Sequence, residues 1–505
     1  PIVFGSDQHN PGDVVAAPYW GDSELWTGVY LGGQAMRYAV ASKYVGSGPN
    51  ENASERAKAN YAQRDFWAGQ QAAALSRVRD MVEAFHRDIT IAQDWDQDLR
   101  VPPGVNTQDP TGTHTADFGG GVVHGEKGMI TRGCTPVGLG PLGINPPSRD
   151  AANPINDHAN HVYEITWRHG DGLTYNCETS PSRDSYAGLT FGLLTAYDLV
   201  AVDDPAMAAT IRQDLIDMAA FLVKYAWNFP RPNGYVGTHN DEDGFVTPIM
   251  VQVPSARLNI VNAARHVAGA ADRPKWDAVW AEEFASQAPL LAAEREINSE
   301  QPSEGYFKFN LDHLTGFNVL RTTTGSERDV MARAFAVMDK TTRDDGNAHF
   351  EALTYGLTGQ ATRRDLAVTH LREWVDYRDN TGGGSEVRNS IRCGVDLSCT
   401  SKDRADLTFD QARDRPVTWY PGQPEAPPLS RSADLRAVAP LPVAQRPAGD
   451  FLWQEPPTKL DGSRPATARE PGIDYLTPYW MVRYFDEVAP PLLQPLPEWA
   501  GPAHS

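Results

Sequence analysis

The sequence lacks the long apolar runs and the excess of positive charge that would direct it to a membrane or a nucleic acid. No stretch approaches the roughly 18 consecutive apolar residues of a membrane-spanning helix. Lys and Arg number 45 against 65 Asp and Glu, which gives a formal net charge of -20. Nucleic acids and anionic membranes bind proteins that concentrate Lys and Arg on one face. We therefore expect no nucleic-acid partner and no membrane span.

Motifs of several enzyme classes are also missing. The glycine-rich segment ADFGGGVVHGE has neither the GxGxxG spacing nor the GK[ST] ending, which argues against phosphate binding. The chain has no GxSxG motif, which argues against an α/β-hydrolase. His158 and His161, with Glu164 nearby, lack the HEXXH spacing of a zinc protease. We therefore expect no metal centre.

Cysteine is scarce, with only Cys134, Cys177, Cys393 and Cys399 in the chain. The last two enclose the short loop CGVDLSC, which suits a disulfide, whereas zinc needs a tighter CxxC spacing and histidines. That pairing leaves Cys134 and Cys177 for a second bridge, and disulfides persist in oxidising compartments. The chain begins at Pro1 without an apolar leader, as expected after signal-peptide removal. We expect a secreted or periplasmic protein, with four reduced thiols as the alternative.

Paired helical segments dominate the rest of the sequence. In each segment, apolar residues recur at spacings of three and four, which indicates an amphipathic helix, and Gly or Pro often separates the segments. Asp204 followed by Pro205 is a typical helix start. The predicted helices span 21–45, 53–86, 181–201, 204–229, 255–270, 274–294, 309–324, 327–342, 349–359, 363–378 and 471–488.

Three regions depart from this helical pattern. Residues 1–20 resemble an extended arm. Residues 89–179 are rich in Gly, Pro, Asn and Asp and contain alternating pieces such as HVYEITW, which predict short strands in a functional insertion. Residues 380–470 include a Pro-rich run that we expect to wrap over the body. Residues 21–505 are predicted to form a single domain, which includes the insertion and the Pro-rich wrapping segment.

Consecutive helix pairs, each needing a neighbour to cover its apolar face, can close into a ring of inner and outer helices. In this respect the chain resembles the six-hairpin, or (α/α)6 toroid, superfamily of glycoside hydrolases, polysaccharide lyases and a few terpenoid-converting enzymes. The resemblance rests on the number of helix pairs, on aromatic helix starts such as ELWTGVYLGG and DYLTPYWMVRYF, and on polar clusters at the connections. It implies an all-α dominated toroid with the insertion over its mouth. It also implies a site where the inner helices begin, but it assigns no individual residue.

The densest group of reactive side chains lies before and within the start of the helix 181–201. We expect Ser180 to be the N-cap and Pro181 to take the first helical position. A buried helix that opens with ionisable residues is typical of a pocket floor. The alternative is an N-terminal ion pair with an acidic residue on the helix dipole. The group comprises Glu178, Arg183, Asp184 and Tyr186.

Three further groups are candidates. The first opens the helix 21–45, where capping carboxylates and core aromatics are the alternative reading; it comprises Asp22, Glu24, Trp26 and Tyr30. The second is the loop His239, Asn240, Asp241, Glu242 and Asp243, for which a solvated turn is the alternative reading and whose DEDG resembles part of a calcium loop. A histidine at the first ligand position and the missing bidentate glutamate make calcium the lesser reading there, and we expect no cofactor. The third, within 308–318, comprises Lys308, Asn310, His313 and Asn318, with satisfied core polar groups as the alternative.

Glycoside hydrolysis requires two carboxyl groups, one as an acid and one as a base or nucleophile. We expect a secreted carbohydrate-active hydrolase of this kind. The predicted catalytic residues are Glu178, Asp184, Tyr186 and His239, and the predicted substrate-binding residues are Arg183, Asp22, Trp26, Tyr30, Asn240 and Asp243.

Three other functions remain open. A polysaccharide lyase would use Tyr186 or His239 as the base and Arg183 to neutralise a uronic acid. The sequence shows no obvious basic groove for an acidic polymer, so hydrolysis is favoured. A toroid dehydratase or isomerase for a small apolar alcohol is suggested by Cys177 beside Glu178. The last alternative is a carbohydrate-binding protein without catalysis.

Overall fold

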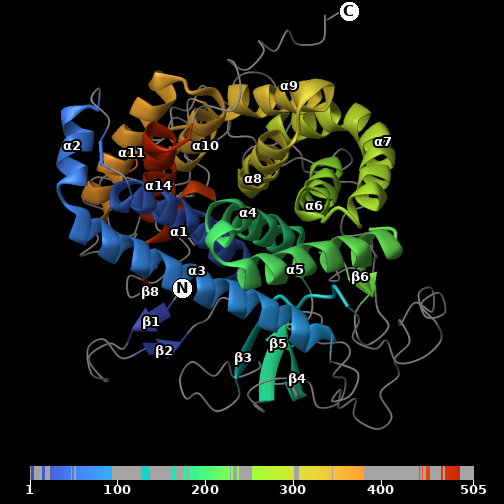
Figure 1. Ribbon diagram of the computed structural model, residues 1–505. Helices are drawn as coiled ribbons and strands as arrows, with labels where there is room; N and C mark the ends of the chain where they lie inside the picture. The colour runs from blue at the N-terminus through green and yellow to red at the C-terminus, as the bar shows by residue number, and fades with distance from the viewer. Residues whose placement is uncertain are drawn as a thin grey trace, which may run out of the picture. The chain divides into compact units, whose positions relative to one another are not determined.

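Helices account for most of the described chain in the computed structural model, and short strands form small sheets beside them (Figure 1). The structure describes residues 2–4, 14–16, 23–46, 48–49, 53–93, 127–136, 162–166, 174–178, 181–227, 229–230, 236–237, 253–300, 306–343, 345–379, 443, 446, 451–454, 468–469 and 472–489. The all-α dominated class predicted from the sequence is therefore confirmed.

The helices follow the predicted pairs closely. Their bounds are α1 Ser23–Val45, α2 Glu55–Tyr61, α3 Arg64–Gln93, α4 Arg183–Leu199, α5 Pro205–Lys224, α6 Pro254–Val267, α7 Arg273–Glu300, α8 Tyr306–Thr322, α9 Gly325–Thr342, α10 Ala348–Thr358, α11 Ala361–Asp379 and α14 Ile473–Glu487, with 3-10 helices η3 Ala201–Asp203 and η8 Leu452–Gln454. The strands are β1 Ile2–Phe4, β2 Val14–Ala16, β3 Gly133–Pro136, β4 Val162–Thr166, β5 Thr174–Glu178, β6 Phe229–Pro230, β7 Val236–Gly237 and β8 Ala468–Arg469. No helix in these ranges is long and apolar enough to cross a bilayer.

The chain divides into two compact units, residues 1–287 and 288–505, with α7 running across the boundary. The prediction of a single domain from residue 21 onward stays a prediction. Each unit is described by itself.

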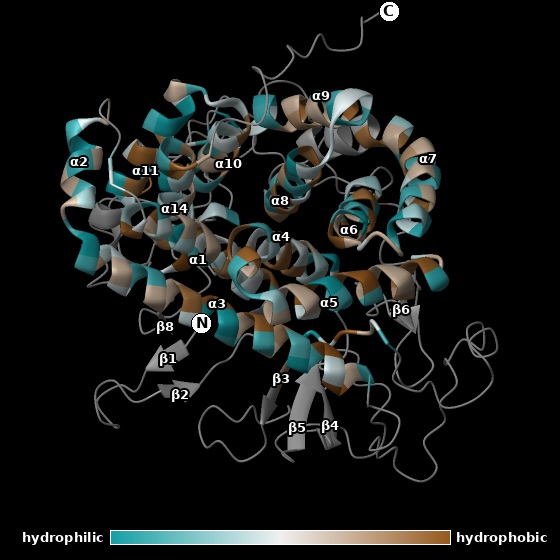
Figure 2. Cartoon of the chain, in the orientation of Figure 1, coloured by the Kyte–Doolittle hydropathy of each residue, from teal (hydrophilic) through white to brown (hydrophobic). Residues whose placement is uncertain are grey.

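In the first unit, deeply buried helices alternate along the chain with helices that bury one face. All residues of α4 from Asp184 to Ala196 are buried, and α1 and α6 are buried along most of their length. By contrast, α3 and α5 expose their polar residues, and bands of hydrophilic and hydrophobic residues alternate along them (Figure 2). The same order holds in the second unit, where every residue of α10 is buried and α9 and α11 each expose a face.

Helices α1 and α4 approach each other through glycines that leave no room for a side chain. A Cβ added to Gly28 would lie 2.0 Å from the Gly188 carbonyl oxygen, and one added to Gly192 would lie 2.5 Å from the Gly28 carbonyl oxygen. A Cβ added to Gly188 would lie 2.4 Å from Cα of Leu25. Gly188 of α4 thus contacts Leu25 of α1, and Gly192, one turn later in α4, contacts Gly28, about one turn later in α1. The two helices run parallel, and their N-termini lie at the same end.

Helix starts confirm the capping prediction for α5 but correct the one for α4. The Asp204 side chain accepts from Met207 N at 3.1 Å, and Pro205 opens the helix as predicted. The N-cap of α4, however, is Ser182 and not Ser180, because Ser182 and Ser185 form a reciprocal capping box that starts the helix at Arg183. Pro181 consequently lies before the cap and not at the first helical position.

The predicted helix 53–86 is two helices, and it ends later than expected. The chain turns at Ala62 and Gln63, where the backbone amides donate to Lys58 O and Asn60 O. No Gly or Pro marks this turn, so the apolar pattern runs through it. α3 then continues past His86 to Gln93, because Ile89, Ile91 and Ala92 are buried and extend its apolar face.

Within the predicted insertion 89–179, strands β3, β4 and β5 form a small antiparallel sheet, as the alternating HVYEITW segment predicted. Strand β5 lies between β3 and β4. In its register, Cys177 lies opposite Cys134 of β3 and Tyr163 of β4. The sheet therefore brings the chain directly to the start of α4.

The glycine contact between α1 and α4 predicts a large effect of one methyl group. Gly188→Ala is expected to lower the free energy of unfolding by about 3 kcal/mol, because the new Cβ overlaps the α1 backbone. Urea denaturation followed by circular dichroism measures it. Gly69→Ala on α3 is the matched control, since its Cβ meets no atom within 4 Å, and it is expected to stabilise α3 by about 0.5–1 kcal/mol. Equal effects of the two variants would contradict the packing described.

Candidate functional site

Two buried carboxylates lie at the N-terminal ends of the parallel helices α1 and α4. Glu24 is one turn before Gly28, and Asp184 is one turn before Gly188, so each lies on the helix face that makes the glycine contact. Their exposed fractions are 2% and 7%. Both belong to the first turn of their helix, where the dipole favours negative charge. Because α1 and α4 are parallel and in contact, Glu24 and Asp184 lie at the same end of the helix pair, each in the first turn of its helix.

Tyr186 joins this group from α4. Its side chain is 1% exposed, and burial together with the nearby Glu24 charge raises the pKa of its phenol well above 10. This effect of Glu24 is in keeping with the close packing of α1 against α4. A phenol in this state keeps its proton at neutral pH, so it donates a hydrogen bond and is a poor base.

Helix α6 adds buried polar groups beside α4, against which it packs. Ser255, Asn259 and Asn262 have exposed fractions of 1–3%. Because α6 is otherwise apolar in its buried part, these side chains give the first unit a polar patch within its core. Hydroxyl and amide groups both donate and accept hydrogen bonds.

The other predicted residues are placed as follows. Arg183, Trp26 and Tyr30 are half-buried. Glu178 is the last residue of β5, and its backbone lies opposite Gly133 of β3 and Val162 of β4. The structure does not describe its side chain, so its pairing with Asp184 stays a prediction. Asp22, His239, Asn240, Asp243, Cys393 and Cys399 also lie outside the described residues.

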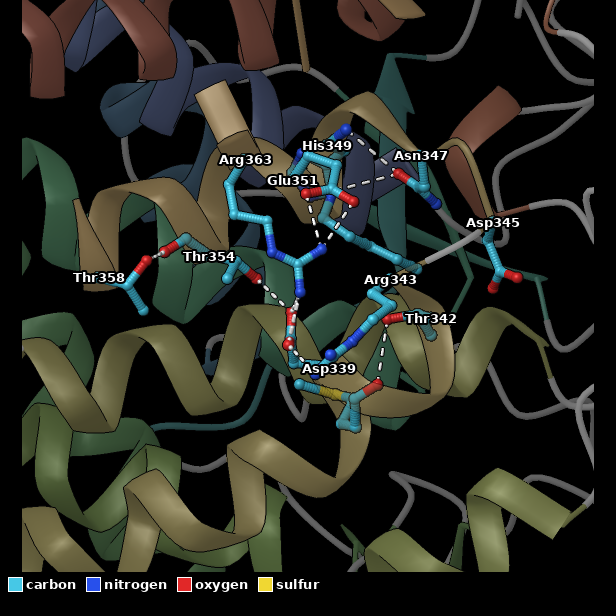
Figure 3. Close-up of polar contacts among 12 residues, drawn as sticks. Asp339, Thr342, Arg343, Asp345, Asn347, His349, Glu351, Thr354, Thr358 and Arg363 are labelled. Carbon is cyan, nitrogen blue, oxygen red and sulfur yellow. Dashed lines mark hydrogen bonds and ion pairs between the residues drawn. The ribbon is translucent and has the colours of Figure 1, made fainter. Parts of the chain in front are cut away.

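A different buried polar group occupies the second unit, around Arg363 of α11. Its guanidinium donates to both Glu351 oxygens at 2.9 Å and to both Asp339 oxygens at 2.6 and 2.7 Å (Figure 3). The three side chains are at most 9% exposed. Thr354 donates to Asp339 at 3.3 Å, and Arg343 donates to it from the surface side at 3.2 Å. This network joins α9, α10 and α11. The carboxylate oxygens of Asp339 and Glu351 all accept hydrogen bonds from Arg363, which indicates a structural role.

The starts of α8 and α10 form another polar group of this unit. Asn347 caps α10 by accepting from His349 N and Phe350 N, each at 3.1 Å, and its amide donates to Trp453 O at 2.7 Å. Tyr306 donates to Asp345 at 3.0 Å. Figure 3 shows Asn347 and Asp345 on the segment that leads into α10.

Of the residues predicted within 308–318, Asn310, His313 and Asn318 are fully buried, and Lys308 is half-buried. The ring of His313 stacks on Phe350 at 3.9 Å, and its Nδ1 donates to Phe309 O at 2.7 Å. The stacking and the Nδ1 hydrogen bond support the satisfied-core alternative for this part of the His313 ring.

Sequence reasoning missed the polar groups of α10 and α11. A signal was present, because Asn347, His349 and Glu351 interrupt an otherwise apolar segment. The sequence could not show that Arg363 is buried, because its neighbour Arg364 has the same side chain but pairs with Asp365 at the surface.

No group of three His, Cys, Asp or Glu side chains in the described ranges is arranged to hold a metal ion. Comparison of the chain with protein-family models, curated proteins and solved structures found no match.

The Arg363 network predicts a specific loss of stability. Arg363→Met is expected to cost about 3–5 kcal/mol, because it leaves Asp339 and Glu351 buried without their shared cation. Arg364→Met, one residue later, is the matched control and is expected to change stability by less than about 0.5 kcal/mol. Chemical denaturation measures both. A cost below about 1 kcal/mol for Arg363→Met would show that the network does not hold these helices together.

Proposed function

We propose that the protein is a carbohydrate-active enzyme, a glycoside hydrolase, whose site includes the starts of α1 and α4. The observation that carries the proposal is the pair Glu24 and Asp184, two buried carboxylates at the same level of two parallel helices. Paired carboxyl groups are the chemical requirement of glycoside hydrolysis. One would protonate the leaving oxygen, and the other would activate water or attack the anomeric carbon.

The remaining residues have supporting roles in this proposal. Tyr186, which keeps its proton, would donate a hydrogen bond to a carboxylate or a sugar oxygen. Arg183, Trp26 and Tyr30 are half-buried at the same helix starts, so they are suited to contact a substrate. Glu178 stays a second candidate for the carboxylate that acts with Asp184, since β5 ends shortly before α4.

Hydrolysis is favoured over elimination by the state of Tyr186. A lyase that used this phenol as its base is disfavoured, because burial and the Glu24 charge raise the pKa of Tyr186 well above 10; the other predicted base, His239, lies outside the described residues. A base works best when its pKa is near the operating pH. The proposal therefore assigns acid-base chemistry to the carboxylates.

We further propose that the helices belong to an (α/α)6 toroid. Within each unit, the alternation of buried helices with helices that bury one face supports this. The parallel arrangement of the two buried helices α1 and α4 is also what neighbouring inner helices of such a ring require. Acidic residues at their starts lie where the superfamily resemblance places a site.

Substitution of the carboxylates tests the hydrolase. A screen of neutral polysaccharides and oligosaccharides with product analysis first identifies the substrate. Glu24→Gln and Asp184→Asn are then expected to lower kcat by at least a thousand-fold while binding is kept, because the amides cannot transfer the proton or form the glycosyl ester. Asp198→Asn is the matched control, because it lies at the opposite end of α4 and pairs with His266 at 2.8 Å.

The control variant, Asp198→Asn, should keep a kcat within about threefold of the wild-type value. Melting curves of all three variants separate lost catalysis from lost folding. Activity in Glu24→Gln and Asp184→Asn near that of the wild type, or a protein inert towards every saccharide tested, would contradict the proposal.

We also propose that Cys134 and Cys177 form a disulfide and that the protein works in an oxidising compartment. Their direct opposition in the β3–β5 register supports this, because paired antiparallel residues have Cα separations that a disulfide can bridge. No free cysteine is found among the described residues. The bridge would anchor the sheet that leads into α4.

The disulfide is tested by peptide mapping of the exported, unreduced protein. Digestion followed by mass spectrometry is expected to yield a peptide that contains Cys134 linked to one that contains Cys177, and reductant should separate them. Alkylation of both thiols before reduction would show that they are free. Cys134→Ala together with Cys177→Ala should lower stability by about 2–4 kcal/mol.

A further inference from the structure

Two buried polar side chains of the second unit lack the hydrogen bonds that their neighbours have. Asn310 of α8 and His349 of α10 are both 0% exposed. Within the described part of the chain, neither amide atom of Asn310 and neither ring nitrogen of His349 has a hydrogen-bond partner. Leaving such groups unsatisfied costs about 1–3 kcal/mol each. Each such group in a folded protein needs an explanation.

Their neighbours show that the segment is not poorly packed. Asn347 uses both amide atoms, and His313, one turn from Asn310, donates to a carbonyl oxygen. Asn310 and His349 differ from these neighbours because every polar side-chain atom of each lacks a partner within the described part of the chain. Such a pattern is typical of side chains that bond to something other than their own protein.

Aromatic contacts bring the two residues to the same place. Tyr306 and His313 lie one turn before and one turn after Asn310, and both rings stack on Phe350, at 6.0 and 3.9 Å. Phe350 follows His349 directly in α10. Asn310 and His349 consequently lie near the same ring, and the His349 ring also contacts Phe451 edge to face, with ring centroids 5.4 Å apart.

The chemistry of the pair selects a neutral ligand with hydroxyl groups. Burial lowers the pKa of His349 to about 3, so its ring is uncharged at neutral pH and has one donor and one acceptor. The amide of Asn310 likewise has donors and an acceptor. A hydroxyl group both donates and accepts, and so matches either residue, whereas a carboxylate or phosphate needs donors and positive charge.

We propose that Asn310 and His349 bind the hydroxyl groups of a neutral sugar or polyol in the second unit. This inference rests on the second unit alone and does not require the carboxylates of α1 and α4. The simplest competing explanation is an internal water molecule, which would satisfy some of the same atoms.

Binding measurements on the full chain test the proposal. The probes are glucose, maltose, cellobiose and xylobiose, with glucuronate as a charged comparator, measured by isothermal titration and by thermal shift at pH 7. At least one neutral saccharide is expected to raise the melting temperature. Asn310→Leu and His349→Phe should each weaken its binding by at least ten-fold. Without ligand they should melt no lower than the wild type, because they remove unsatisfied polar atoms.

Asn318→Leu is the matched control, since Asn318 lies on the same helix and is equally buried. It should keep the wild-type affinity. No response to any neutral saccharide, or wild-type affinity in both Asn310→Leu and His349→Phe, would overturn the proposal. A lower melting temperature in both variants with unchanged affinity would overturn it in favour of internal water. The carboxylate variants of the first unit should still bind, so the failure of one proposal is distinguishable from failure of the other.

Discussion

The close approach of α1 and α4 is the constraint on which the candidate site depends. With Gly28 and Gly188 in contact, the two backbones come as near as sterics permit. Dispersion contacts over such a close interface accumulate, and a dense core fixes the positions of the side chains at its ends. Because the helices are parallel, their first turns meet at one end, and the two helix dipoles both favour negative charge there. Glu24 and Asp184 occupy that end.

The two units handle buried charge in different ways. In the second unit, Asp339 and Glu351 share the Arg363 guanidinium, so attraction and hydrogen bonds offset the loss of hydration. This is a stable arrangement with no group left to react. The polar side chains at the starts of buried helices are of another kind. They include acidic residues, an undissociated phenol and an uncharged imidazole, all of which have groups that form hydrogen bonds.

The helix pairs were predictable because apolar spacing and turn residues agree along most of the chain. Asp204 with Pro205 is an example in which the local signal is unambiguous. The start of α4 was misplaced because Ser180 and Ser182 both precede it, and only the hydrogen bond with Ser185 selects between them. The turn at Ala62 was missed because neither Gly nor Pro marks it. Arg363 and Arg364 illustrate a deeper limit, since burial of one and exposure of the other follow from packing between distant segments.

The candidate site was partly predictable for a related reason. Asp184 and Tyr186 follow a polar loop directly, so the sequence pointed to them, and Glu24 was noted among the acidic residues of its helix start. Their proximity, however, depends on the parallel packing of α1 and α4, which the spacing of residues along one helix does not determine.

The most direct test of the site is a crystal structure of the Asp184→Asn variant with an uncleaved oligosaccharide substrate. The account predicts a glycosidic oxygen or anomeric carbon within hydrogen-bonding or van der Waals distance of the Glu24 carboxylate and the residue 184 amide. A saccharide bound with its scissile bond away from both helix starts would contradict it.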